Sequence, residues 1–147
     1  MKVELTILFT LCICSFSLAQ TTTATSSYKE DVEKASRIIT AEAHKYGYNK
    51  VISYDNVKDA SMFVFPNKSY VIYYIYGKPD VAPVFVAYLM HKDKAMRKKY
   101  SAQPYDIGVV GVARVSRVTF DTKNFGYDKL PVKLEAKPNA TIYIFQK

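Results

Sequence analysis

Residues 70–76 read Tyr-Val-Ile-Tyr-Tyr-Ile-Tyr and are apolar or aromatic at every position. A strand with one solvated face alternates apolar and polar residues, whereas a strand covered on both faces is apolar throughout. Tyrosine, valine and isoleucine also suit the pleated surface of a sheet. The segment therefore predicts a central β-strand with protein packed against both of its faces.

Other strand-like segments lie on both sides of this one, separated by turn signatures. Pro66-Asn67-Lys68-Ser69 precedes the central strand and Gly77-Lys78-Pro79-Asp80 follows it, and such residues favour turns. A similar turn, Lys137-Pro138-Asn139-Ala140, predicts a final hairpin. The predicted strands are 51–54, 62–65, 70–76, 84–90, 107–120 with a bend at Gly108 and Gly111, 132–136 and 141–145.

A helix is predicted before the strands, over residues 28–46. Ser27 and Glu30 form a Ser-x-x-Glu capping box, in which each side chain accepts a hydrogen bond from an otherwise unpaired backbone N–H. Gly47 is suited to end the helix, because glycine adopts the left-handed backbone of that position. One apolar stripe follows the helical period, made of Val32, Ala35, Ile38, Ile39, Ala43 and Tyr46.

Residues 28–147 therefore form a single predicted domain, mainly β with an α+β composition. About seven strands follow the helix without alternating with helices, which argues against a parallel nucleotide-binding sheet. We expect an antiparallel β-sandwich or sheet, with the N-terminal amphipathic helix packed on it or covering one edge.

Residues 1–19 have the pattern of a secretory signal peptide. A short charged start precedes an apolar run over 5–18, and small residues occupy positions 17 and 19, three and one before a cut after Ala19. The run is too short for a membrane anchor, which needs about 20 apolar residues, and neither Cys12 nor Cys14 has the position of a lipidated cysteine. The junction resembles that of Gram-negative bacterial exports. We therefore expect a secreted or periplasmic mature chain with a flexible start at 20–27 and no transmembrane segment.

Residues 62–147 resemble a known family. Phe63-Val64-Phe65-Pro66-Asn67-Lys68-Ser69-Tyr70-Val71-Ile72 looks like the strand, turn and strand that open small secreted bacterial β-sandwich modules of the pre-peptidase C-terminal type. Residues 84–93 look like the strand that comes next in those modules, and 141–145 like their closing strand. The turn lacks their usual glycine, and the leading helix is not part of the pattern. The resemblance implies a noncatalytic accessory or binding module and transfers no functional residues.

Patterns for metal and nucleophilic chemistry are sparse. After loss of both cysteines with the signal peptide, the chain has no thiolate and only two imidazoles, those of His44 and His91. These are too few for a usual structural zinc site. We interpret both histidines as surface residues. The chain has no Gly-x-Ser-x-Gly nucleophile elbow and no glycine-rich phosphate loop. We therefore expect no cofactor and no metal.

Two pairs of acids leave a hydrolytic alternative open. Asp55 and Asp59 flank a short loop, as do Asp121 and Asp128, and a glycosidase needs only two converging carboxylates. Acids near turns more often accept hydrogen bonds from the local backbone. We therefore expect a protein without catalytic activity, with a carboxylate-dependent hydrolase as an alternative.

Positive charge is the clearest functional signal. The chain has 21 Lys and Arg against 13 Asp and Glu, a formal net charge of +8. A solvated basic face that maintains solubility is one interpretation, and a docking surface for an anionic partner is the other. Basic charge alone does not distinguish polyanions, but an exported protein does not meet nucleic acid. The densest cluster, called the basic segment below, contains Lys92, Lys94, Arg97, Lys98 and Lys99.

Tyrosines provide a second candidate surface. Tyr70, Tyr74 and Tyr76 fall on one face of the predicted central strand. If that face is exposed, it forms an aromatic platform that could stack on sugars or grip a protein. If it is buried, the three side chains belong to the core. The apolar character of both faces favours burial.

These observations lead to a functional hypothesis. We expect a noncatalytic binding or accessory domain at the bacterial cell envelope, with an anionic polysaccharide, lipopolysaccharide or an envelope protein as partner. The basic segment and the three tyrosines are the candidate contact residues. A periplasmic inhibitor or immunity-type protein that blocks an enzyme is a further alternative.

Overall fold

The computed structural model describes residues 28–77, 84–90, 104–123 and 128–147. The predicted signal peptide, the flexible start at 20–27 and the basic segment lie outside these residues. The described chain is mainly β, with one helix over 28–45 and six strands. The strands are β1 (Asn49–Val64), β2 (Ser69–Tyr76), β3 (Val84–Leu89), β4 (Tyr105–Val110), β5 (Ala113–Asp121) and β6 (Leu130–Gln146).

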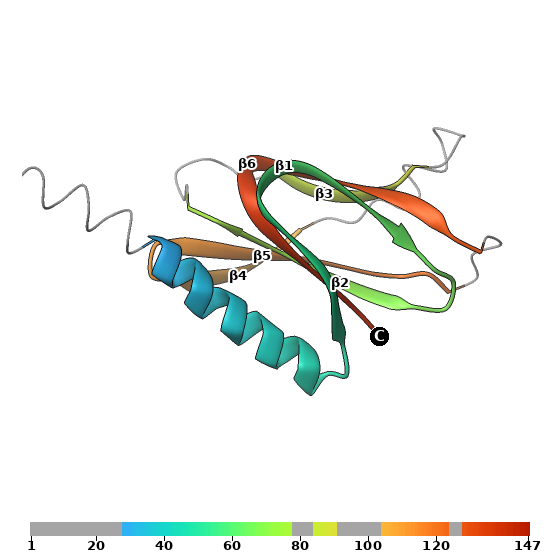
Figure 1. Cartoon of the computed structure of the whole chain (residues 1–147), viewed down its shortest axis with the longest axis horizontal. Helices are drawn as coiled ribbons and strands as arrows, with labels where there is room; N and C mark the ends of the chain where they lie inside the picture. Colours follow the sequence, from blue (N-terminus) through green and yellow to red (C-terminus); the bar gives the residue numbers. More distant parts are fainter. Residues whose placement is uncertain (1–27, 78–83, 91–103, 124–127) are drawn as a thin grey trace, which may run out of the picture.

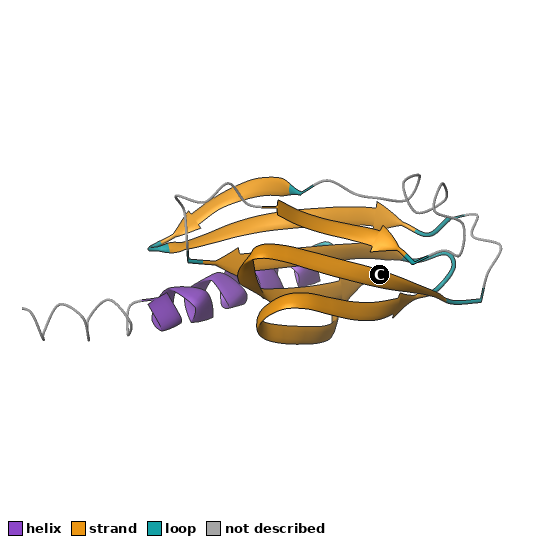
Figure 2. Cartoon of the chain, turned by 90° about the horizontal axis from the view of Figure 1, so that it is seen from above, coloured by secondary structure: helices purple, strands orange, loops and turns teal. Residues whose placement is uncertain are grey.

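All six strands belong to one antiparallel sheet. Its order is β1-β6-β2-β5-β4, and β3 pairs with β6 off this path. Figure 1 shows the helix beneath the sheet, and Figure 2 shows it along one side of the strands. The helix therefore covers one sheet face, as the sequence predicts.

Strand β6 organises the sheet because it is 17 residues long and has partners on both sides. One side pairs with β1 over almost the whole length of both strands. The other side pairs with β3 over residues 132–137 and with β2 over 141–146. In Figure 1 the ribbons of β1 and β6 turn together beside the β6 label. Both halves of β6 thereby contribute side chains to the same core.

Strand β2 separates two cores. Tyr70, Ile72, Tyr74 and Tyr76 pack with the inward residues of β1 and β6 in the first core. The alternate residues Val71, Tyr73 and Ile75 pack beneath the helix in the second. Every residue of the segment is at most 4% exposed. The prediction of a central strand covered on both faces is confirmed.

The predicted strand count of seven and the sandwich of two sheets are not confirmed, since the described strands form one sheet. Predicted strands 51–54 and 62–65 are parts of the single strand β1, and 107–120 divides into β4 and β5 at a turn around Gly111. The predicted final hairpin is wrong, because β6 continues through the cis Lys137–Pro138 peptide. Each half of β6 finds its partners in other strands, so residues 137–140 do not reverse the chain.

The end of the helix follows its sequence signal. Gly47 has a φ of 81°. Its N–H donates to the carbonyl oxygen of His44 at 2.9 Å, and the N–H of Tyr48 donates to that of Ala43 at 2.9 Å. These two bonds form a Schellman motif, which satisfies carbonyls left unpaired at a helix end.

The apolar stripe of the helix is narrower than predicted. Ala35, Ile39 and Ala43 are buried, whereas Ile38 and Tyr46 are exposed. Asp31 is buried instead, and its carboxylate accepts a hydrogen bond from the Val112 N–H at 2.9 Å. This bond ties the first described turn of the helix to the turn between β4 and β5.

Burial of tyrosines gives an expected pH dependence of stability. Burial is the main cause that raises the pKa of Tyr28, Tyr70, Tyr73 and Tyr74 above the ordinary value of 10.0. Groups whose folded pKa is raised stabilise the fold fully below their unfolded pKa, and this stabilisation is lost as the pH rises through the folded pKa. We therefore expect the free energy of unfolding to fall above pH 10.0.

The measurement is an alkaline titration followed by tyrosinate absorbance and far-ultraviolet circular dichroism. The buried hydroxyls of Tyr70, Tyr73 and Tyr74, whose pKa values are raised by burial, should ionise only together with loss of the β signal. A single smooth ionisation of all tyrosines with no structural transition would contradict the burial described above.

Candidate functional site

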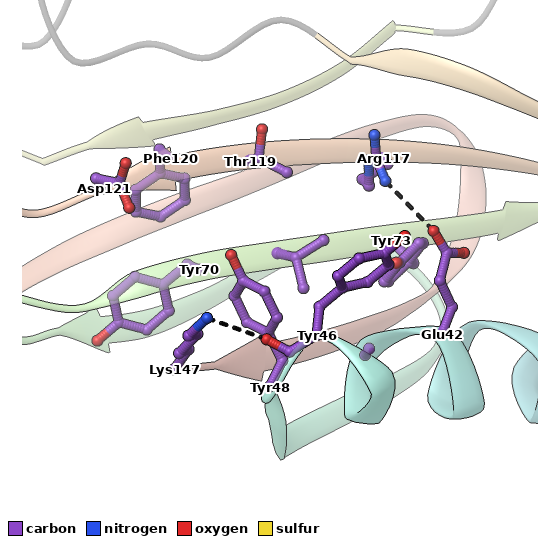
Figure 3. A pocket seen from close by; sticks show the side chains of 12 residues that line it. Glu42, Tyr46, Tyr48, Tyr70, Tyr73, Arg117, Thr119, Phe120, Asp121 and Lys147 are labelled. Atoms are coloured by element: carbon purple, nitrogen blue, oxygen red, sulfur yellow. Dashed lines mark hydrogen bonds and ion pairs between the residues drawn. The ribbon is translucent and has the colours of Figure 1, made fainter.

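A groove of about 520 Å³ lies on the helix-covered side of the sheet, where the helix ends. Figure 3 shows side chains from the helix end, β2, β5 and the residue after β6 around it. Aromatic rings and charged groups of both signs share its wall. The lining residues are Glu42, Ala43, Tyr46, Tyr48, Tyr70, Val71, Tyr73, Arg117, Thr119, Phe120, Asp121 and Lys147.

Local sequence explains how the groove is built. The Schellman turn at Gly47 reverses the chain, so that Tyr46 and Tyr48 stand on either side of the helix end. Arg117 and Thr119 alternate along β5 and therefore share the face that the helix covers. The Lys147 Nζ donates a hydrogen bond to the Tyr46 carbonyl at 3.1 Å and lies 5.8 Å from the Tyr48 ring centroid. The helix end and the end of β6 are thereby held together.

An ion pair occupies one end of the groove. The Arg117 Nη1 lies 3.6 Å from the Glu42 Oε1, and both side chains are about one-third exposed, at 34%. The Arg117 guanidinium also lies 5.9 Å from the exposed Tyr105 ring. Because an exposed pair of this kind is weakly stabilising, the guanidinium can exchange Glu42 for another carboxylate without a large loss of stability.

A buried tyrosine lies beneath this pair. Tyr73 is 2% exposed, and its ring meets Phe145 edge-on at 5.8 Å between centroids. Burial and the nearby Glu42 carboxylate raise the pKa of the Tyr73 hydroxyl, while a hydrogen bond with Arg117 opposes this. The hydroxyl is therefore a neutral hydrogen-bonding group at physiological pH, placed at the floor of the groove.

The opposite end of the groove contains a second acid. Asp121 accepts a hydrogen bond from the Ser69 hydroxyl, and beside it the Tyr70 and Phe120 rings stack at 5.3 Å between centroids. Figure 3 places Glu42 and Asp121 at opposite ends, with Arg117 and Thr119 between them. The two carboxylates of the groove therefore do not converge on one point.

The predicted site residues do not assemble as one surface. Tyr74 and Tyr76 are fully buried in the first core, and Tyr70 is 1% exposed at the edge of the groove. They form no open aromatic platform. The basic segment lies outside the described residues, so its relation to the groove stays a prediction.

The predicted acid pairs have separate local partners. Asp55 accepts a hydrogen bond from the Thr141 hydroxyl at 2.8 Å, and Asp59 lies 3.7 Å from the Lys133 Nζ. Asp121 bonds to Ser69, and Asp128 is exposed. In the part of the chain that the structure describes, no three His, Cys, Asp or Glu side chains gather as a metal-binding group. The described helix also lacks the length and apolar character needed to cross a membrane.

Arg114 and Arg117 lie on opposite faces of the sheet, as expected for two residues three positions apart on one strand. Arg117 lies on the face covered by the helix, whereas Arg114 bonds to Asp106 at 2.6 Å and pairs in register with Tyr76. Both are about one-third exposed, and each has a carboxylate partner.

No family model, curated protein or solved structure matches the chain. The candidate site is therefore inferred from the residues of this chain alone.

Most groove residues were missed by the sequence interpretation, because Glu42, Arg117 and Lys147 come from three distant segments. The one local signal was Gly47, whose turn brings two tyrosines to the helix end.

Proposed function

We propose that this protein is a noncatalytic binding domain at the bacterial cell envelope and that its groove holds a carboxylated saccharide. The observation that supports this proposal is that tyrosine rings and Arg117 line the same open groove. Sugars present apolar ring faces that stack on aromatic side chains, and hydroxyls that need donors and acceptors. The carboxylate of an acidic sugar matches the planar fork of an arginine.

Each part of the groove has a role in this proposal. Tyr46, which is 58% exposed, and Tyr48 supply the stacking surface. Arg117 leaves Glu42 to pair with the ligand carboxylate, and the Tyr73 hydroxyl bonds to the same guanidinium. Thr119 and Asp121 provide a hydroxyl and an acceptor for sugar hydroxyls farther along the groove.

The cellular location rests on sequence. The signal-peptide pattern of residues 1–19 supports export, and the net charge of +8 supports an anionic partner. The resemblance of residues 62–147 to pre-peptidase C-terminal modules supports an accessory role without catalysis. The separate partners of Asp55 and Asp59, the Thr141 hydroxyl and the Lys133 ammonium group, argue against the hydrolase alternative.

Arg117→Gln should lower affinity for an acidic oligosaccharide at least about tenfold, because it removes a charge-assisted bidentate contact. Binding of oligogalacturonate is followed by tyrosine fluorescence, for which the absence of tryptophan leaves a clean signal. The matched control is Arg114→Gln, which removes an equally exposed arginine from the opposite sheet face. A neutral malto-oligosaccharide tests the need for a carboxylate.

Five results would contradict the proposal. Oligogalacturonate that does not bind would rule out this ligand class, and equal binding by both arginine variants would show that Arg117 takes no part in recognition. Equal affinity for the neutral sugar would show that binding does not require a carboxylate on the ligand. Release of reducing ends during the titration would instead favour the hydrolase, and a salt-resistant one-to-one protein complex from envelope extract would favour the inhibitor.

A further inference from the structure

Two phenylalanines at the end of β1 face outward from the sheet. Phe63 is 54% exposed and Phe65 is 46% exposed, whereas Met62 and Val64 between and beside them are buried in the first core. Phe63 points away from the core side of β1, and Phe65, which follows the last residue of the strand, is also exposed. Two half-exposed phenylalanines one strand period apart require an explanation, because burying such rings is strongly favourable.

Further apolar surface adjoins these rings. Phe63 pairs in register with Pro131, and the Met90 N–H donates to the Pro131 carbonyl at 2.8 Å. Met90 is itself 37% exposed. We call the surface formed by Phe63, Phe65, Met90 and Lys129 the phenylalanine tip.

The tip is rigid rather than a loose loop. The Thr122 side chain is fully buried, and its hydroxyl donates to the Phe65 carbonyl and lies within hydrogen-bonding distance of the Lys68 carbonyl. The Lys68 N–H donates back to the Thr122 hydroxyl oxygen at 2.9 Å. The Phe65 N–H donates to the hydroxyl oxygen of the buried Tyr70 at 2.9 Å. Both phenylalanines are thereby presented by backbone that the core holds in place.

A cationic group lies against one of the apolar rings. The Lys129 Nζ lies 4.9 Å from the Phe63 ring centroid, in cation–π range. Lys68 is part of the turn that Thr122 fixes, and the exposed Lys123 follows Thr122 directly. Exposed apolar rings beside Lys129, on a chain of net charge +8, complement a negatively charged layer.

We propose that the phenylalanine tip docks on the surface of a bilayer that contains anionic lipids. Phe63, Phe65 and Met90 enter the boundary between headgroups and acyl chains, where apolar side chains leave water. Lys129 remains at the headgroup level, where each cation near an anionic membrane adds attraction. Arg117 lines the groove on the helix-covered face, whereas the Tyr70 end of the groove adjoins the tip, because the Tyr70 hydroxyl accepts the Phe65 N–H. The inference uses the two phenylalanines and not Arg117, so it does not rest on the saccharide proposal.

The test is co-sedimentation of the protein with vesicles of phosphatidylglycerol and phosphatidylethanolamine. We expect binding that weakens with added salt, and little binding to phosphatidylcholine vesicles. The double substitution Phe63→Ala/Phe65→Ala should lower the partition coefficient at least about tenfold. The matched control is Tyr105→Ala/Val109→Ala, which removes two exposed apolar side chains of β4.

A second variant separates a lost contact from a folding defect. Lys129→Glu reverses one exposed charge and leaves the apolar core intact, and it should also weaken binding to anionic vesicles. Arg117→Gln should bind vesicles as the wild-type protein does. The proposal is overturned if anionic vesicles do not retain the wild-type protein, if neutral vesicles retain it equally, or if the β4 control loses binding to the same extent. A vesicle-free dimer that Phe63→Ala/Phe65→Ala dissociates would assign the tip to self-association instead and also overturn it.

Discussion

Leu134→Ala should lower the free energy of unfolding by about 2–5 kcal/mol. Leu134 is fully buried in the first half of β6, where it pairs in register with Ala60 of β1 and Ala87 of β3. Its side chain belongs to the core that also contains the β2 tyrosines. Truncation leaves a cavity among large rings that cannot move closer without disturbing the strand ladder.

Urea unfolding followed by circular dichroism measures this loss. Phe63→Ala is the matched control, because it shortens a larger side chain of the same ladder that is already half exposed. The control should cost less than about 1 kcal/mol, as surface substitutions generally do. Equal losses in the two variants would contradict the burial of Leu134 and the exposure of Phe63.

Gly111→Ala should cost about 2–4 kcal/mol, through two effects at one position. Gly111 has a φ of 59°, in the left-handed region that disfavours a residue with a Cβ. A Cβ there would lie 2.0 Å from the Asp31 Oδ2, which accepts the Val112 N–H. The Asp31 carboxylate must move, and the bond that ties the helix to the sheet is lost.

A double-mutant cycle with Asp31→Ala separates the two effects. In the absence of the Asp31 carboxylate, Gly111→Ala should retain only the backbone cost, so the two substitutions should be less than additive. Thermal unfolding of the four proteins supplies the coupling energy. Strictly additive losses would show that Asp31 and Gly111 are independent, and a neutral Gly111→Ala would contradict the left-handed backbone.

Local patterns predicted the elements, and long-range pairing decided their arrangement. The run over 70–76 is apolar on both faces whatever surrounds it, so its central position could be inferred. The Lys137-Pro138-Asn139-Ala140 segment has turn composition, yet β6 passes through it because β1, β2 and β3 supply partners on both sides. Those partners are distant in sequence, and no local signal encodes them.

The groove could not be predicted for a related reason. Arg117 and Glu42 are separated by 75 positions in the chain and meet only after the helix packs on β5. Tyr46 continues the helical period and was therefore interpreted as core, but the chain turns at Gly47 and leaves it exposed. Charge density instead directed the sequence interpretation to the basic segment, which lies outside the described residues.

The pairing of β6 has a consequence for how the chain acquires its structure. Asn49 pairs with Gln146 and Val64 with Leu130, so the contacts that define the ladder close very long loops. Strands β1, β2 and β3 are made first but share no ladder with one another, and each needs β6 as its neighbour. Long-range antiparallel closure of this kind is slow, because the entropy of the loop must be lost before any pairing is gained. As the polypeptide emerges from its amino terminus, β1 and β3 should therefore remain unpaired and accessible to chaperones until the last strand has appeared.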